Sequence, residues 1–177
     1  MKLRLARGEI LSTRHAWMIL LLATELAANS AAGAAVQPAA KSLATYANVR
    51  YGYTIEYPKD LLVPGEEADD GDGVVFSAKS SSGQVAVWGR YNANRDTPAR
   101  ILRDEEQSAC ADAPPSYEVS KRSLVAFSCR TRKDAIVYEQ MIIRGDTLVA
   151  VQFSYPASEQ TMWSPVVKQM AHSLNIE

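Results

Sequence analysis

The sequence predicts an α+β fold whose elements follow the order βββ-α-ββββ-α. The strongest observation is a hairpin from Asp134 to Tyr155, in which two apolar runs flank the tight sequence Arg144-Gly145-Asp146-Thr147. Glycine accepts the positive φ that a two-residue hairpin turn needs. Two further segments have the pattern of helices, one before this hairpin and one after it.

Both strands of the hairpin carry apolar residues on both faces. In the second strand one face holds Val149, Val151, Phe153 and Tyr155, and the other begins with Leu148 and Ala150. In the first strand Ile136, Tyr138 and Ile142 alternate with Val137, Met141 and Ile143. Strands that are apolar on both faces lie in the interior of a sheet. We therefore expect the hairpin to be a central pair that is covered on both sides.

The remaining elements follow from shorter patterns. Alternating apolar residues predict further strands at 49–57, 74–79, 84–91, 117–121 and 124–131, with a loop over 59–73. Thr97 and Pro98 have the residue types of an N-cap and a first helical position, so a helix is expected over 98–109. An apolar stripe predicts a second helix over 158–174, bent at Pro165. The alternative is a shorter helix that starts at Ser164 with Pro165 as its first residue.

The N-terminal third of the chain has a different composition. A basic start containing Lys2, Arg4 and Arg7 precedes an apolar run over 17–28 and a stretch of small residues over 29–35. This order is typical of a secretory signal peptide. We expect cleavage of residues 1–34, the alternative being an uncleaved anchor. The mature chain would be periplasmic or secreted, without a stable membrane span. It would begin with a flexible lead-in over 35–48, followed by a single domain over 49–177.

Cys110 and Cys129 are the two cysteines of the chain. In an exported protein an even number of cysteines favours a disulfide, because the compartment is oxidising. Closing this loop would contribute roughly 3 kcal/mol in the chain-entropy model. The alternative is a pair of free, buried thiols.

Composition argues against several functional classes. The formal net charge of −1 gives no indication of nucleic-acid binding. Only His172 remains after signal cleavage, and there is no Gly-x-Ser-x-Gly elbow, so no catalytic residue is assigned. A zinc site would need more histidine or cysteine ligands. The acidic loop 66–73 fails the calcium-loop pattern, since Ala68 and Lys79 fall at ligand positions. We therefore expect no metal and no cofactor.

An aromatic set with an arginine is the best candidate for binding. Trp, Tyr and Arg are the residue types enriched at binding hot spots. The candidate residues are Trp88, Arg90, Tyr91, Tyr51 and Tyr53. Ordinary core and edge packing is the alternative for all five. Gly89, inside the same strand, is expected to mark a bulge or a close approach of another backbone. A basic group formed by Arg122, Arg130, Arg132 and Lys133 would suit an acidic partner.

The ends of the predicted domain resemble a known family. The opening reads Tyr53-Thr-Ile-Glu-Tyr-Pro-Lys-Asp60, and the end reads Phe153-Ser-Tyr-Pro156, followed by Trp163 in a final helix that ends Ser173-Leu174. With the order of elements, these resemble the PsbP-like α/β/α sandwich family, which includes DcrB-type periplasmic proteins. The resemblance implies an antiparallel sheet of about six to seven strands with helices packed on both faces. It also implies mainly non-catalytic, protein-binding roles.

Together these observations predict an exported, non-catalytic binding protein of the bacterial envelope. It would recognise a protein partner through a sheet and helix surface. The alternative is a small-molecule-binding or hydrolytic periplasmic protein with an unrecognised site. A deep apolar pocket at Trp88 would favour that alternative, and so would carboxylates clustered around His172.

Overall fold

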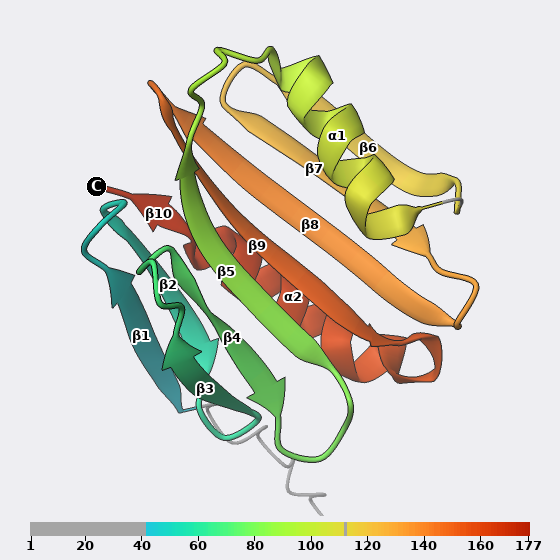
Figure 1. The fold of residues 1–177 in the computed structure, drawn as a ribbon. Coiled ribbons are helices and arrows are strands. Elements are labelled where there is room, and N and C mark those ends of the chain that lie inside the picture. The colour runs from blue at the N-terminus through green and yellow to red at the C-terminus, as the bar shows by residue number, and fades with distance from the viewer. Residues whose placement is uncertain (1–41, 112) are drawn as a thin grey trace, which may run out of the picture. The chain divides into compact units, whose positions relative to one another are not determined.

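The computed structural model describes residues 42–177, except residue 112 (Figure 1). A seven-stranded antiparallel sheet has the order β3-β4-β5-β9-β8-β7-β6. Its strands are β3 (Leu62–Glu67), β4 (Gly73–Ala78), β5 (Gln84–Tyr91), β6 (Pro115–Lys121), β7 (Leu124–Arg130), β8 (Ala135–Arg144) and β9 (Thr147–Pro156). A three-stranded sheet consists of β1 (Leu43–Asn48), β2 (Tyr53–Pro58) and β10 (Asn175–Ile176). The helices are α1 (Pro98–Cys110) and α2 (Gln160–Ser173), and a 3-10 helix, Ala157–Glu159, leads into α2.

The alternation of side chains along β9 divides the large sheet into two faces. Val151 and Phe153 are buried in a cluster with Trp163 of α2, and we call this side the α2 face. Leu148 and Ala150 are buried in a second cluster with residues of α1, on the side that we call the α1 face. The two helices lie on opposite sides of the sheet (Figure 1). The α+β class and the helices on both faces are therefore confirmed.

The predicted hairpin is the centre of the large sheet. β8 and β9 pair from Ala135 opposite Pro156 to Arg144 opposite Thr147. Gly145 has φ +60° in the turn between them, as the turn chemistry requires. β9 also pairs along its length with β5, so it has a neighbour on each side. The expected division of the hairpin residues between two covered faces is confirmed.

Both helices occur near their predicted positions. The Thr97 hydroxyl accepts a hydrogen bond from the backbone N–H of Arg100, which makes Thr97 the N-cap of α1. The last residue of α1, Cys110, forms a disulfide with Cys129 of β7, which confirms the predicted bridge. α2 begins at Gln160 and contains Pro165. The Ser164 hydroxyl donates to the carbonyl oxygen of Gln160 within the first turn of this helix.

The N-terminal part of the described chain differs from the prediction. Instead of a flexible lead-in, residues 43–48 form β1, and β2 begins at Tyr53 rather than at residue 49. Val49, which is 95% exposed, lies in the turn between these strands. The Ala- and Thr-containing β1 has no strong apolar alternation of its own. It is a strand because it pairs with β2.

Two other strands were also missed. β3 lies within the predicted loop 59–73, and β10 follows the last helix. Only Leu62 is buried in β3, and a register shift occurs between Pro64 and Glu67, so its sequence carries little strand signal. β10 has only two residues. The observed order is therefore βββββ-α-ββββ-α-β, with a second sheet that was not expected.

The predicted signal peptide and residues 35–41 of the predicted lead-in lie outside the described residues. Cleavage and export therefore stay predictions. Within residues 42–177, leaving aside residue 112, neither helix is long and apolar enough to cross a membrane.

Candidate functional site

The predicted aromatic set is divided between the two faces of the sheet. Trp88 and Arg90 are on the α1 face, because they alternate with Val85 and Val87, which belong to the cluster on the α2 face. Tyr91 follows the alternation of the α2 face and is exposed. The five residues therefore do not form one patch.

Tyr51 and Tyr91 form a smaller patch on the α2 face. Their ring centroids are 5.1 Å apart, and the guanidinium carbon of Arg50 lies 5.2 Å from the Tyr51 ring centroid. A Cβ atom on Gly89 would come within 2.6 Å of Tyr51 side-chain atoms. The pairing of β5 with β9 is regular at this position. Gly89 therefore marks the close approach of a side chain, so the predicted bulge or approach of another backbone is wrong.

Tyr53 belongs to the hydrophobic core. Its side chain is 1% exposed, and its hydroxyl donates to the carbonyl oxygen of Asp72 at 3.1 Å. Burial is the main factor that raises its pKa well above the usual range for tyrosine. Tyr53 therefore contributes no exposed surface to a binding patch.

Beneath α1, the structure brings together a polar group that the sequence analysis missed. Arg90 of β5 forms an ion pair with Glu105 of α1, with 2.8 Å between nitrogen and oxygen. The neighbouring Glu139 of β8 is 1% exposed, and its Oε2 accepts a hydrogen bond from the side-chain amide of Gln152. Its Oε1 has no hydrogen-bond partner. The sequence feature that could have indicated this group is Glu139, a glutamate within the apolar run of β8.

Burial raises the pKa of Glu139 to about 8, and the nearby Glu105 adds to the increase. The hydrogen bond from Gln152 and the positive charge of Arg90 oppose it. Such a carboxyl is neutral at neutral pH. Because Glu139 is covered, it is a structural group that holds a proton and not an open catalytic site.

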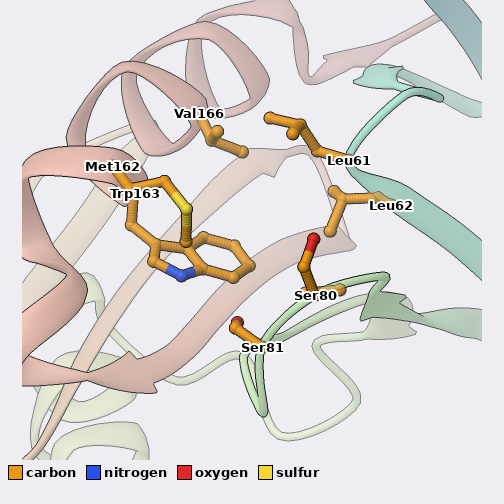
Figure 2. Close-up of a pocket in the computed structure, with 8 residues that line it drawn as sticks. Leu61, Leu62, Ser80, Ser81, Met162, Trp163 and Val166 are labelled. Carbon is orange, nitrogen blue, oxygen red and sulfur yellow. The ribbon is translucent and has the colours of Figure 1, made fainter.

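A small apolar crevice lies where α2 meets the β3 and β4 end of the molecule (Figure 2). The indole of Trp163 and the side chains of Met162, Val166, Leu61 and Leu62 surround it, with Ser80 and Ser81 at its edge (Figure 2). Its volume is about 20 Å³. Because this is room for little more than one water molecule, the crevice is too small for a metabolite.

An open groove of about 530 Å³ lies between α2 and β8, and we call it the α2 groove. Tyr138 and Gln140 of β8 lie on one side, and Lys168 and His172 of α2 lie on the other. The described residues that line it are Ser128, Ile136, Tyr138, Gln140, Tyr155, Gln160, Ser164, Val167, Lys168, Ala171 and His172.

Hydrogen bonds fix the shape of the α2 groove. The side-chain amide of Gln140 donates to the carbonyl oxygen of Ala171 at 2.8 Å, which ties β8 to α2. The Tyr138 hydroxyl donates to Oε1 of the same Gln140 at 3.3 Å. On the β6 side, Tyr117 stacks against Tyr138 with ring centroids 6.4 Å apart, and Tyr117 is 50% exposed. An exposed aromatic surface therefore continues beyond the groove.

Among the described residues, the lining of the α2 groove contains no carboxylate and no cysteine. His172 therefore lies beside an amide, hydroxyls and a lysine, without the acid that would orient it as a catalytic base. A second depression, of about 670 Å³, is lined by Arg122, Ser123, Leu124, Ile142, Ile143, Arg144 and Gly145. Acidic side chains are also absent from the described residues that line this depression. The two open sites therefore present cations together with apolar and hydrogen-bonding groups.

The predicted basic group is only partly assembled at these sites. Arg122 lines the second depression, whereas Arg130 forms an ion pair with Asp134 at 2.5 Å. Arg132 and Lys133 lie in the connection between β7 and β8.

In the acidic loop, the pKa of Asp72 is raised by burial and by the nearby Asp70. Among the described residues, no three His, Cys, Asp or Glu side chains are placed to hold a metal ion.

Trp88 lines a shallow site on the α1 face, of about 250 Å³, together with residues of β3 and β4. This open site is not the deep pocket that would favour a small molecule. The α2 groove was missed because its shape depends on where α2 rests on the sheet. The signal for it was the pair Tyr138 and Gln140, two hydrogen-bonding residues in the otherwise apolar stripe of β8.

No family model matches the sequence, and no curated protein matches it. Among solved structures, the chain is similar to the solution structure of cyanobacterial PsbP (CyanoP) from Synechocystis sp. PCC 6803. The TM-score is 0.57 and the sequence identity is 13%, over 78% of this chain and 94% of that chain. At this identity the similarity concerns the fold. This α+β chain therefore has the PsbP-like fold that its sequence predicted.

Proposed function

We propose that this chain is an exported, non-catalytic binding protein that recognises an acidic segment of a partner protein in the bacterial envelope. The observation that carries this proposal is the α2 groove, an open site with aromatic, amide and cationic side chains and no carboxylate in its lining. The described residues that line this groove do not include any of the aromatic set predicted from the sequence.

The shape of the groove favours a macromolecule over a metabolite. Small-molecule sites usually enclose most of their ligand. The α2 groove is an open site, and the apolar crevice at Trp163 has only about 20 Å³. An open surface with exposed Tyr117 beside Tyr138 suits the broad contact of a protein segment.

The charges favour an acidic partner. Lys168 is exposed on the α2 side of the groove, and Arg122 and Arg144 line the depression at the far end of β8. Within the part of the chain that the structure describes, no acidic side chain lines either site to neutralise them. Complementary charge would steer and orient an acidic segment more than it would increase affinity.

The disulfide supports export, because such bonds persist in oxidising compartments. The predicted signal peptide gives the same indication. Both are consistent with a periplasmic or secreted location. The proposed partner would then be another envelope protein.

Site-specific photo-crosslinking in the cells that produce the protein tests this proposal. A photoreactive residue at the exposed Gln160, on the groove, should give a discrete crosslinked protein. The matched control is the same residue at Val75, which is 46% exposed on the opposite face. Lys168→Glu should reduce the product at position 160 at least several-fold, whereas Lys59→Glu, an exposed control, should leave it unchanged. Equal products at positions 160 and 75, or no effect of Lys168→Glu, would contradict the proposal.

A further inference from the structure

Two arginines lie opposite each other at one end of the large sheet. The backbone N–H of Ile143 on β8 donates to the carbonyl oxygen of Ser123 at 2.9 Å, which extends the β7–β8 ladder into the turn between β6 and β7. One further step in the same register places Arg122 opposite Arg144. Residues that face each other across a strand pair have Cβ atoms about 5 Å apart. Both arginines line the second depression, of about 670 Å³, so their side chains share one site.

The charges of these two arginines are not compensated. Among the described residues, neither Arg122 nor Arg144 takes part in an ion pair, and Asp146, in the same turn as Gly145, is not within ion-pair distance of either. Like charges directly opposite each other in a strand pair are destabilising. An anion bound between the two guanidinium groups would remove this repulsion.

The guanidinium group of Arg144 is already held in place. Its Nη1 donates a hydrogen bond to the carbonyl oxygen of Ile176 in β10. Arginine has several N–H donors in a planar fork, so this bond leaves others available to a ligand. A side chain that is ordered before binding loses less conformational entropy when the ligand arrives. Arg122, exposed in the turn, supplies the second guanidinium group.

We propose that this depression binds a phosphate group, carried by a small molecule or by a lipid headgroup, between the guanidinium groups of Arg122 and Arg144. A phosphate monoester carries a charge of about −1.5 to −2 at neutral pH and three acceptor oxygens, which matches two arginines. A carboxylate has a single charge and would leave one arginine without a counter-charge. Ser123, in the same lining, adds a hydroxyl donor. This inference goes beyond the proposed function, which rests on the α2 groove and Lys168, so either can fail without the other.

An NMR titration of the disulfide-bonded protein with inorganic phosphate, at an ionic strength held constant with sodium chloride, measures the affinity. The amide signals of Ser123 and Gly145 should shift and saturate in the millimolar range. Arg122→Gln should weaken binding roughly 10-fold, because it removes charge-assisted hydrogen bonds. The matched control is Arg103→Gln, which removes an exposed arginine from α1, on the other side of the sheet, and should leave the affinity unchanged.

A second arm distinguishes the source of the phosphate group. It uses vesicles of phosphatidylcholine with and without phosphatidic acid, whose headgroup ends in a phosphate monoester. Binding to inorganic phosphate that depends on Arg122 supports a site for a small phosphorylated molecule. Binding only to the vesicles with phosphatidic acid, with the same dependence, supports a lipid headgroup. No binding in either arm, or an equal loss in Arg103→Gln, would overturn the proposal.

Urea unfolding of Arg122→Gln separates a binding role from a structural one. In sodium chloride alone the variant should unfold at a slightly higher urea concentration than the parent, because one of two facing cations is gone. In saturating phosphate this order should reverse, since only the parent gains stability from the ligand. Arg103→Gln should show no such reversal. If Arg122→Gln is the less stable protein in both solutions, the arginine is structural and the phosphate site is wrong.

Discussion

The side-chain amide of Gln152 on β9 donates a hydrogen bond to Oε2 of Glu139 on β8, with 2.7 Å between nitrogen and oxygen. The two residues face each other directly across the strand pair. They lie in the middle of the large sheet, where Glu139 is buried. A carboxyl group in this place links the stability of the central strands to pH.

We predict that the protein loses stability at alkaline pH through Glu139. Burial raises the pKa of Glu139 from 4.5 to about 8, so the folded chain binds this proton more tightly than the unfolded chain. The contribution is fully present below about pH 4.5 and is lost as pH rises through 8. Between pH 5 and pH 9 the loss is about 4 kcal/mol. Urea unfolding across this range measures it.

Glu139→Gln should remove most of this pH dependence and make the protein more stable than the parent at pH 9. The new amide keeps a hydrogen-bond acceptor for Gln152 and never ionises. Glu56→Gln, at an exposed position on β2, is the control and should follow the parent curve. Parallel curves for the parent and Glu139→Gln would show that this carboxyl does not control the alkaline limb.

The disulfide should stabilise the attachment of α1 to the sheet. Replacing both Cys110 and Cys129 by alanine opens a loop with a sequence separation of 19, so the free energy of unfolding should fall by about 3 kcal/mol. Amide hydrogen exchange should become faster in α1 and β7, beyond the general change in stability. A loss below about 1 kcal/mol would mean that packing of Ile101 and Leu102 already holds the helix.

Gly83 should be intolerant of a side chain because Trp163 covers it. A Cβ at this position would lie 2.1 Å from Cζ2 of the indole (the ring is shown in Figure 2). Gly83→Ala should therefore destabilise the protein by about 1–3 kcal/mol, measured by urea unfolding. Ser82→Ala, at the exposed neighbouring position, is the control.

Trp163→Phe should partly rescue Gly83→Ala. A smaller ring leaves room for the new methyl group, so the double variant should lose less stability than the sum of the two single variants. Additive losses would place the strain in the backbone of Gly83 and not in its contact with the indole.

The sequence was most informative where one segment carries its own pattern. The run from Ala135 to Pro156 contains its turn and both apolar faces, so its strands were predicted to within one residue. β1 and β10 have little pattern of their own and are strands because each pairs with β2. When a strand forms because it pairs with a distant segment, the sequence of either segment alone contains almost no pattern that predicts the pairing.

The candidate site shows the same limit. The sequence identified Trp88 and Tyr91 as residue types that are enriched at binding sites. Their alternation along β5, however, places them on different faces of the sheet. The α2 groove depends on the contact of Gln140 with Ala171, residues separated by 31 positions. No local motif encodes that contact. Gln140 was visible in the sequence only as an isolated amide in an apolar stripe.

The position of β9 has a consequence for the order in which the chain can fold. β5 ends at Tyr91. The strand that pairs with it toward the centre of the sheet is β9, which begins only at Thr147, after α1 and three more strands. Until that late segment joins, the first five strands and the β6–β8 meander are separate pieces with exposed apolar edges. Non-local pairings of this kind are slow to form. The central pairing of the large sheet therefore cannot be completed until nearly all of the chain is available.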